Sequence, residues 1–254
     1  MALNPRTELP IFLLALQFLT RLPITVRDYS PDRMAASPRW YPGVGAVIGL
    51  GEGLVLAGAA AIWPTPVAAI LAIGFSLLLT GAMHEDGFAD ACDGLGGGRT
   101  KDRALEIMRD SRIGAYGAVG LLLILSDRIA LLSALSPLAA PFILMAGHAA
   151  SRAAMLWVMQ VDPYVRGQGT GSAVAQPIDE DGRQIAIGTT LIAALPLLMA
   201  LPFHAVILAI GGTILGLVAM RQRFRPFLGG YTGDCLGAVQ QAALLGFLLG
   251  AAAF

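Results

Sequence analysis

The chain has 254 residues, of which 56% are hydrophobic and 13% charged, and its basic and acidic side chains balance to a formal net charge of zero. Soluble domains carry about 25% charged residues, so the composition excludes an ordinary soluble domain and indicates a membrane protein. The lack of a basic excess also argues against nucleic acid as a partner.

Apolar stretches long enough to cross a bilayer recur along the whole chain. A transmembrane helix needs about 20 apolar residues to cross roughly 30 Å of hydrocarbon. Seven stretches meet this need, at about 42–62, 65–83, 113–135, 138–160, 185–201, 203–220 and 235–254. An eighth, at 9–20, has only twelve residues, so we expect it to be interfacial or re-entrant. The sequence therefore predicts an all-α, polytopic helix bundle that forms one membrane-embedded domain over residues 1–254.

The connections between these stretches are of two kinds. Segments 21–39, 84–112, 161–184 and 221–233 all contain basic residues, whereas 63–66, 136–137 and 201–202 contain no charge. By the positive-inside rule, the charged connections face the cytoplasm and the short ones face outward. We therefore expect any functional site to lie on the cytoplasmic face, where the charged connections meet the bundle.

The first charged cluster is HEDGFADACDG, from His84 to Gly94. Asp86, Asp90 and Asp93 fall at i, i+4 and i+7, so they share one helical face if the preceding helix continues through His84. Like charges at this spacing repel, and hard oxygen ligands suit Mg²⁺ or Mn²⁺. These three aspartates are candidate catalytic residues and metal ligands; a solvated helix end with ordinary charges is the alternative.

The two residues that open this cluster have less certain roles. Glu85 lies off the aspartate face, and we expect it to be solvated or paired with an arginine. His84 is a candidate general base or phosphate donor, because imidazole has an unperturbed pKa of about 6.5. A histidine that simply ends an apolar stretch at the interface is an equal alternative.

A second cluster, from Arg99 to Gly117, is expected to lie on the membrane surface as a short helix. It ends in Arg109, Ser111 and Arg112, directly before the next apolar stretch. Arginine forks and the free N–H groups of a helix start both bind phosphate, so these three side chains are candidate substrate-binding residues. Anchoring of the loop by positive charge is the alternative for the arginines.

The third cluster precedes the last apolar stretch. Asp234 is predicted either to cap the helix that begins there or to supply a further metal ligand. Arg225 and Thr232, in the same segment, are candidate substrate-binding residues.

Charged residues also occur inside the apolar stretches, where they are costly and often functional. They are Glu52, Asp127, Arg128 and Arg152, with His148 four residues before Arg152 on the same helical face. We expect them to pair with one another and hold the bundle together; a substrate cavity that reaches into the membrane is the alternative.

Five motifs in this order resemble those of the cobalamin synthase (adenosylcobinamide-GDP ribazoletransferase) family. They are FLTRLP at 18–23, PGVGAVIG at 42–49, HEDGFADACDG at 84–94, LEIMRDSRIGAYG at 105–117 and GGYTGDCLGA at 229–238. Together they extend over nearly the whole chain, and the combination of the acidic motif with LEIMRDSRIG is highly specific.

The resemblance implies a multi-pass transferase of the cell inner membrane that acts late in cobalamin biosynthesis, with its active site facing the cytoplasm. Such an enzyme uses Mg²⁺, or Mn²⁺ in its place, to join adenosylcobinamide-GDP to α-ribazole or its 5'-phosphate and releases GMP. Other enzymes of the pathway are further candidate partners. A membrane cation or small-solute transporter is the main alternative, and a scaffold for soluble enzymes is a third hypothesis.

Overall fold

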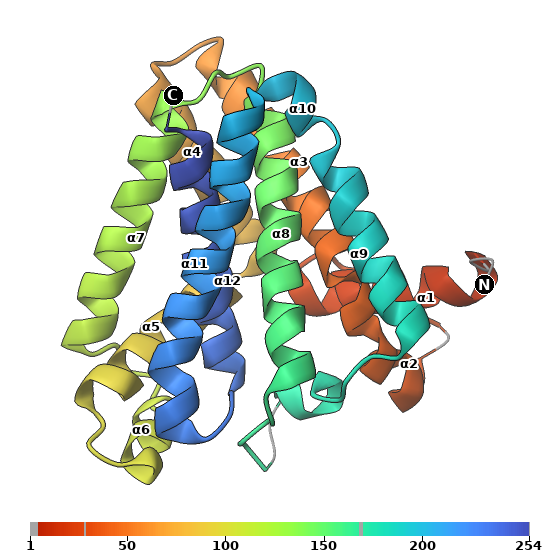
Figure 1. Ribbon diagram of the computed structural model, residues 1–254, viewed down its shortest axis with the longest axis vertical. Coiled ribbons are helices and arrows are strands. Elements are labelled where there is room, and N and C mark those ends of the chain that lie inside the picture. The colour runs from red at the N-terminus through yellow and green to blue at the C-terminus, as the bar shows by residue number, and fades with distance from the viewer. Residues whose placement is uncertain (1–4, 28, 168–169, 254) are drawn as a thin grey trace.

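A computed structural model describes residues 5–27, 29–167 and 170–253 of the chain (Figure 1). Its elements in chain order are α1 (Pro5–Leu19), α2 (Pro31–Ala36), η1 (Ser37–Trp40), α3 (Tyr41–Ala60), α4 (Thr65–Thr80), α5 (Met83–Gly97), α6 (Lys101–Ile107), α7 (Ala115–Ala134), α8 (Ala140–Val161), η2 (Thr170–Val174), α9 (Glu180–Ala194), α10 (Leu197–Ala200), α11 (Phe203–Leu228) and α12 (Gly233–Ala251). These described residues form helices without a named strand, which confirms the predicted all-α class.

Six of the described helices are long and apolar enough to cross a membrane, or seven if α4 and α5 count as one bent span. The six are α3 with the short helices before it, α7, α8, α9 with α10, α11 and α12. They correspond to six of the seven predicted stretches, and α4 begins the seventh. The chain is therefore a multi-pass membrane protein.

The N-terminal helix α1 is not one of these candidate spans. Its 15 residues give a length of about 22 Å at 1.5 Å per residue, which is short of the roughly 30 Å of hydrocarbon. In Figure 1 it runs across the direction of α8 and α11 near the lower half of the bundle. This placement fits the expected interfacial or re-entrant segment.

The helix before His84 does not continue through it, so that part of the sequence prediction is wrong. Gly81 and Ala82 both have left-handed backbones, with φ of 66° and 54°, and α5 leaves α4 at an angle of 89°. A Cβ on Gly81 would meet the Arg21 side chain, and the left-handed backbone would strain any larger residue there. The acidic cluster still lies on a single helix, because α5 contains all of its residues.

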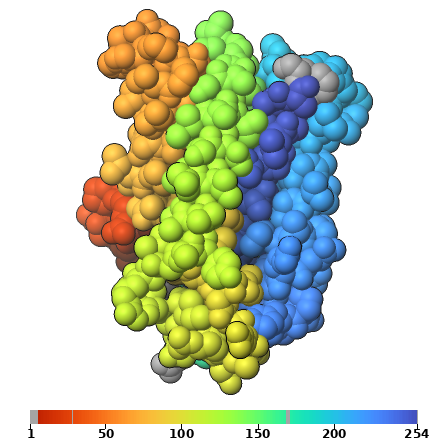
Figure 2. Space-filling model, turned by 90° about the vertical axis from the view of Figure 1, so that its left-hand side faces the viewer, coloured from red at the N-terminus to blue at the C-terminus, as the bar shows by residue number. Residues whose placement is uncertain are grey.

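Close helix pairs hold the bundle around α12. Glycines allow α3 to approach α8 and α11 to approach α12: Cβ atoms added at Gly49 and Gly216 would meet the backbones of Leu144 and Ala242. In addition, α12 packs on α5, α7 and α8. Figure 2 shows α7 on the outside, between the orange α3–α4 region and the blue α11 and α12, with α6 below.

The charged connections all lie at one end of this bundle. In Figure 1, α6, the segment after α8 and the turn between α11 and α12 are at the lower end, while the short uncharged connections are at the upper end. The structure thus confirms the predicted separation of the connections; the cytoplasmic assignment of the charged end stays a prediction.

Topology reporters test that assignment. Fusions after Pro64, Pro137 and Pro202 should report the periplasm, and fusions after Lys101 and Arg223 should report the cytoplasm, because basic residues are retained on the cytoplasmic side. Paired alkaline phosphatase and fluorescent protein fusions give the measurement. A cytoplasmic signal after Pro137 would contradict the model of one charged cytoplasmic face.

Candidate active site

A pocket of about 440 Å³ opens at the charged end of the bundle. Its polar lining consists of His84 and Asp86 from α5, Arg109 after α6, Arg166 after α8, Asp234 from α12 and the tyrosines Tyr41, Tyr164 and Tyr231. Met155 and Met159 of α8 and Phe18 of α1 contribute an apolar wall. One side of the pocket is therefore charged and the other aromatic and apolar.

Close packing of α5 on α12 brings the acidic residues of the two helices together. A Cβ added at Gly87 would lie 3.1 Å from the Cα of Asp234, and one at Gly237 would lie 2.9 Å from the His84 carbonyl oxygen. Asp86 and Asp234 both line the pocket, whereas Asp90, one helical turn after Asp86 on α5, is not among the lining residues. The structure thus brings two of the predicted metal ligands to the pocket and places the third on the same helix.

Asp93 has a different environment. Its carboxylate accepts hydrogen bonds from the backbone N–H groups of Gly114 and Gly117, at 2.7 and 2.9 Å. It thereby satisfies the free donors at the start of α7, the same donors that the sequence offered as a phosphate site. In this structure Asp93 anchors α5 to α7, and its assignment as a catalytic metal ligand stays a prediction.

Asp234 forms an ion pair instead of capping α12. Its Oδ2 lies 2.6 Å from Nη2 of Arg166, and the same oxygen accepts from the Thr232 hydroxyl at 3.3 Å. The cap is Thr232, whose Oγ1 accepts from the N–H of Cys235. The buried Thr232 therefore organises the start of α12 and orients Asp234.

Of the residues predicted to bind substrate, only Arg109 lines the pocket. Thr232 is fully buried against the pocket-lining Asp234, and substrate binding by it stays a prediction. Ser111 and Arg112 are exposed, and Arg112 donates to both carboxylate oxygens of Asp110. These hydrogen bonds lower the pKa of Asp110 to about 2. Their place outside the pocket lining gives no support to a role in substrate binding, which stays a prediction for Ser111 and Arg112.

Arg225 also lies away from the pocket. Together with Arg221 it donates to the buried carboxylate of Asp162, each at 2.7 Å. Burial alone would raise the pKa of Asp162, but the two guanidinium groups hold it below its usual value. This cluster ties the end of α8 to the end of α11, and substrate binding by Arg225 stays a prediction.

Sequence analysis did not identify Arg166 or the tyrosines as site residues. Arg166 is fixed by a short backbone pairing, in which the N–H of Val165 donates to the Tyr231 carbonyl at 3.0 Å and the N–H of Tyr231 donates to Pro163 at 2.9 Å. Burial raises the pKa of the neighbouring Tyr231 phenol to about 12. No local pattern in the sequence indicates this pairing, because it joins segments distant along the chain.

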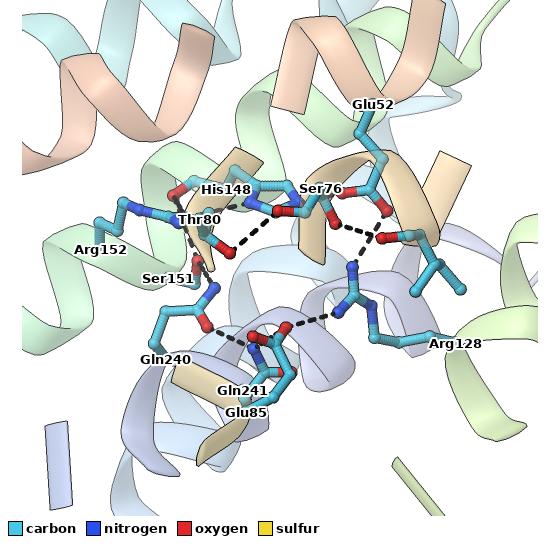
Figure 3. Close-up of polar contacts among 11 residues, drawn as sticks. Glu52, Ser76, Thr80, Glu85, Arg128, His148, Ser151, Arg152, Gln240 and Gln241 are labelled. Atoms are coloured by element: carbon cyan, nitrogen blue, oxygen red, sulfur yellow. Dashed lines mark hydrogen bonds and ion pairs between the residues drawn. The ribbon is translucent and has the colours of Figure 1, made fainter. Parts of the chain in front are cut away.

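Within the bundle, eight buried residues form a hydrogen-bonded network (Figure 3). Seven of them close a ring, in which the Ser151 hydroxyl donates to the backbone carbonyl of His148: Glu52 of α3, Glu85 of α5, Arg128 of α7, His148 and Ser151 of α8, and Gln240 and Gln241 of α12. Arg152 of α8 joins this ring through His148. Arg128 joins Glu52 at 3.0 Å to Glu85 at 3.2 Å. The ring thus connects five helices and includes the residue next to Asp86.

The hydrogen-bond partners of His148 define its protonation state. Arg152 lies 3.0 Å from His148 Nδ1 and can only donate, so this nitrogen must be the acceptor. The other ring nitrogen, Nε2, then donates to Glu52 at 2.7 Å. His148 is therefore neutral, and two glutamates balance two arginines.

The expected internal pairing is thus confirmed for Glu52 and Arg128. Arg152 hydrogen-bonds to His148 instead of an acid, and Asp127 is exposed on α7 and takes no part in the ring. Of the two alternatives for Glu85, pairing with an arginine is correct and solvation is wrong.

The donor set of the pocket suits a hard cation. Among the described residues, no three acidic, histidine or cysteine side chains are arranged as a preformed metal site. Magnesium, however, usually takes only one or two carboxylates and completes its shell with water and substrate phosphates. Asp86 and Asp90, with Asp234 nearby, fit that requirement.

The fold and the pocket define a multi-pass membrane protein with an acidic, arginine-lined site at one end of its helix bundle. Residues 11–252 match the family model described as cobalamin-5-phosphate synthase. The chain belongs to this family of enzymes.

Curated relatives agree with the family model. Adenosylcobinamide-GDP ribazoletransferase of Leptothrix cholodnii is 41% identical over 96% of both chains. The proteins of the same name from Azorhizobium caulinodans and Vibrio cholerae are 41% and 38% identical, over 93% and 95% of this chain and 92% of theirs. No solved structure matches the chain.

Replacing Arg128 tests the contribution of the ring to stability. Arg128→Met leaves Glu52 and Glu85 buried without their shared cation, and breaking a buried ion pair costs about 3 to 5 kcal/mol. The free energy of unfolding in mixed micelles, measured by denaturing-detergent titration, should fall by that amount. The adjacent exposed Asp127→Asn is the matched control and should change little; equal stabilities of the two variants would contradict the ring's role.

Proposed function

We propose that the chain is a Mg²⁺-dependent transferase of the cell inner membrane, which joins adenosylcobinamide-GDP to α-ribazole or its 5'-phosphate and releases GMP on the cytoplasmic side. The observation that carries this proposal is the pocket in which Asp86 and Asp234 face Arg109 and Arg166. Acids that bind a cation, together with arginines that bind phosphate, are the groups that a diphosphate substrate requires. Family membership supports the substrates named in the relatives.

The reaction is a phosphoryl transfer, in which a protein contributes mainly positioning and charge neutralisation. A ribose hydroxyl of α-ribazole forms the new bond to the phosphorus on the cobinamide side, and the bond from that phosphorus to GMP breaks. Asp86 and Asp90 would hold Mg²⁺, which would neutralise charge on the diphosphate. Arg109 binds non-bridging oxygens from the mouth of the pocket.

His84 is the residue best placed to take the hydroxyl proton. It lines the pocket and is only 3% exposed, and its Nε2 has no hydrogen-bond partner among the described residues. A general base needs a free lone pair within reach of the attacking group. The aromatic and thioether wall formed by Tyr164, Tyr231 and Met155 provides an apolar surface for a flat base.

The arrangement gives less support to the transporter alternative. A transport path requires charged or polar groups that line a route across the bilayer. Here the glutamates and arginines inside the bundle pair with one another in the closed ring, and the open pocket lies at one end.

Removing the charge of a metal ligand should abolish the reaction. Asp86→Asn and Asp90→Asn keep side-chain size but remove the charge that Mg²⁺ requires. GMP release from adenosylcobinamide-GDP should fall more than about 100-fold, because even outer-shell partners of metals contribute 10- to 100-fold. Asp102→Asn, on the exposed face of α6, is the control. If the Asp86 and Asp90 variants keep the activity and Mg²⁺ dependence of the control, the metal lies elsewhere.

A matched pair of arginine variants tests which side chain binds phosphate. Lysine keeps the charge but lacks the two-pronged geometry of arginine, so Arg109→Lys should lose activity about tenfold or more. Arg112→Lys, outside the pocket, should retain it. Steady-state GMP release is measured for both variants. If Arg112→Lys loses activity and Arg109→Lys retains it, Arg112 is the substrate ligand.

A further inference from the structure

Arg166 has a donor that its present hydrogen bonds leave unused. Its Nη2 donates two hydrogen bonds, to Asp234 at 2.6 Å and to the Met108 carbonyl at 3.3 Å. Its Nε is buried and has no hydrogen-bond partner within the described part of the chain. A buried donor without a partner is unfavourable, so this guanidinium is incompletely satisfied at the wall of the pocket.

The backbone that carries Arg166 is well anchored. Tyr164 and Tyr231 form a parallel bridge, and Gly230 packs so closely on Pro163 that a Cβ would overlap the carbonyl oxygen. The side chain is 16% exposed, so the guanidinium projects from a fixed point toward the pocket. Rotation of its outer bonds can change its partner without moving the backbone.

Asp234 is the partner that such a rotation would release. Its side chain is 15% exposed and lies against Arg166, while its charge also acts on Asp90. A cation bound near Asp86 and Asp90 would supply the positive charge that Arg166 now provides to Asp234. Arg166 and the cation therefore compete for the same carboxylate.

We propose that Arg166 is a phosphate-binding residue that exchanges partners during substrate binding. Without ligands it neutralises Asp234; when a divalent cation and a nucleoside diphosphate enter together, its guanidinium turns to the phosphate oxygens and Asp234 turns to the cation. This inference rests on the proposed function of the pocket. The cation frees Arg166 for the diphosphate, and the diphosphate frees Asp234 for the cation. The two ligands therefore bind cooperatively.

The exchange has a signature that a purely structural role lacks. Arg166→Gln frees Asp234 from its ion pair, so Mn²⁺ alone should bind about fivefold to tenfold more tightly than to the unmodified chain, within the range of ordinary coupling between sites. The same variant lacks the phosphate ligand, so GDP at saturating Mn²⁺ should bind about tenfold more weakly. Loss of structure in the variant would instead weaken the binding of both Mn²⁺ and GDP.

The experiment uses the full chain in detergent micelles. Free Mn²⁺ is followed by electron paramagnetic resonance without nucleotide, and retention of radiolabelled GDP is measured at saturating Mn²⁺. Arg103→Gln, exposed on α6 and outside the pocket lining, is the control and should match the unmodified protein. Arg166→Lys keeps a positive charge beside Asp234 but lacks the two-pronged guanidinium. Its Mn²⁺ affinity should therefore be unchanged, and only its GDP affinity should fall.

Opposite shifts of the two affinities in Arg166→Gln support the exchange. Weakening of both, or affinities equal to those of the control, would overturn it. The Asp86→Asn variant distinguishes failure of the partner exchange from failure of the proposed metal site. If Mn²⁺ binding depends on Asp86 but Arg166→Gln changes neither affinity, the exchange alone fails. If Asp86→Asn binds Mn²⁺ normally, the proposed metal site fails.

Discussion

Charge balance inside the bundle is the constraint on which the site depends. Charges in hydrocarbon are costly unless they are paired. In the ring, Arg128 pairs with both Glu52 and Glu85, and Arg152 is joined to Glu52 through His148. Glu85 directly precedes Asp86 on α5. Because its carboxylate is held by Arg128 and Gln241 toward the interior, the rotation of α5 is fixed and Asp86 faces the pocket.

Two further contacts orient the same helix. The left-handed pair Gly81 and Ala82 turns α5 by 89° from α4, and Asp93 attaches its far end to the first N–H groups of α7. The acidic helix is thus held by its start, its inner face and its end. Side chains held in this way suit phosphoryl transfer, in which precise placement of charge matters most.

The sequence predicted the spans and the acidic helix well, because apolar length and carboxylate spacing are local signals. It missed the bend, since glycine is common in transmembrane helices and nothing local indicates a left-handed Ala82. It also missed Arg166, which lies 68 positions before Asp234 and meets it only through the pairing of Tyr164 with Tyr231. Arg112 looked equivalent to Arg109 in sequence, yet in the structure Arg109 lines the pocket, whereas Arg112 is exposed and pairs with Asp110.

We propose that the pocket between α5 and the start of α12 binds a divalent cation together with a diphosphate. A crystal structure grown with Mn²⁺ and GDP, with data collected at the manganese absorption edge, tests this proposal. We expect an anomalous peak beside Asp86 and Asp90, with the diphosphate between it and Arg109. A peak at another site, with the diphosphate outside this pocket, would contradict it.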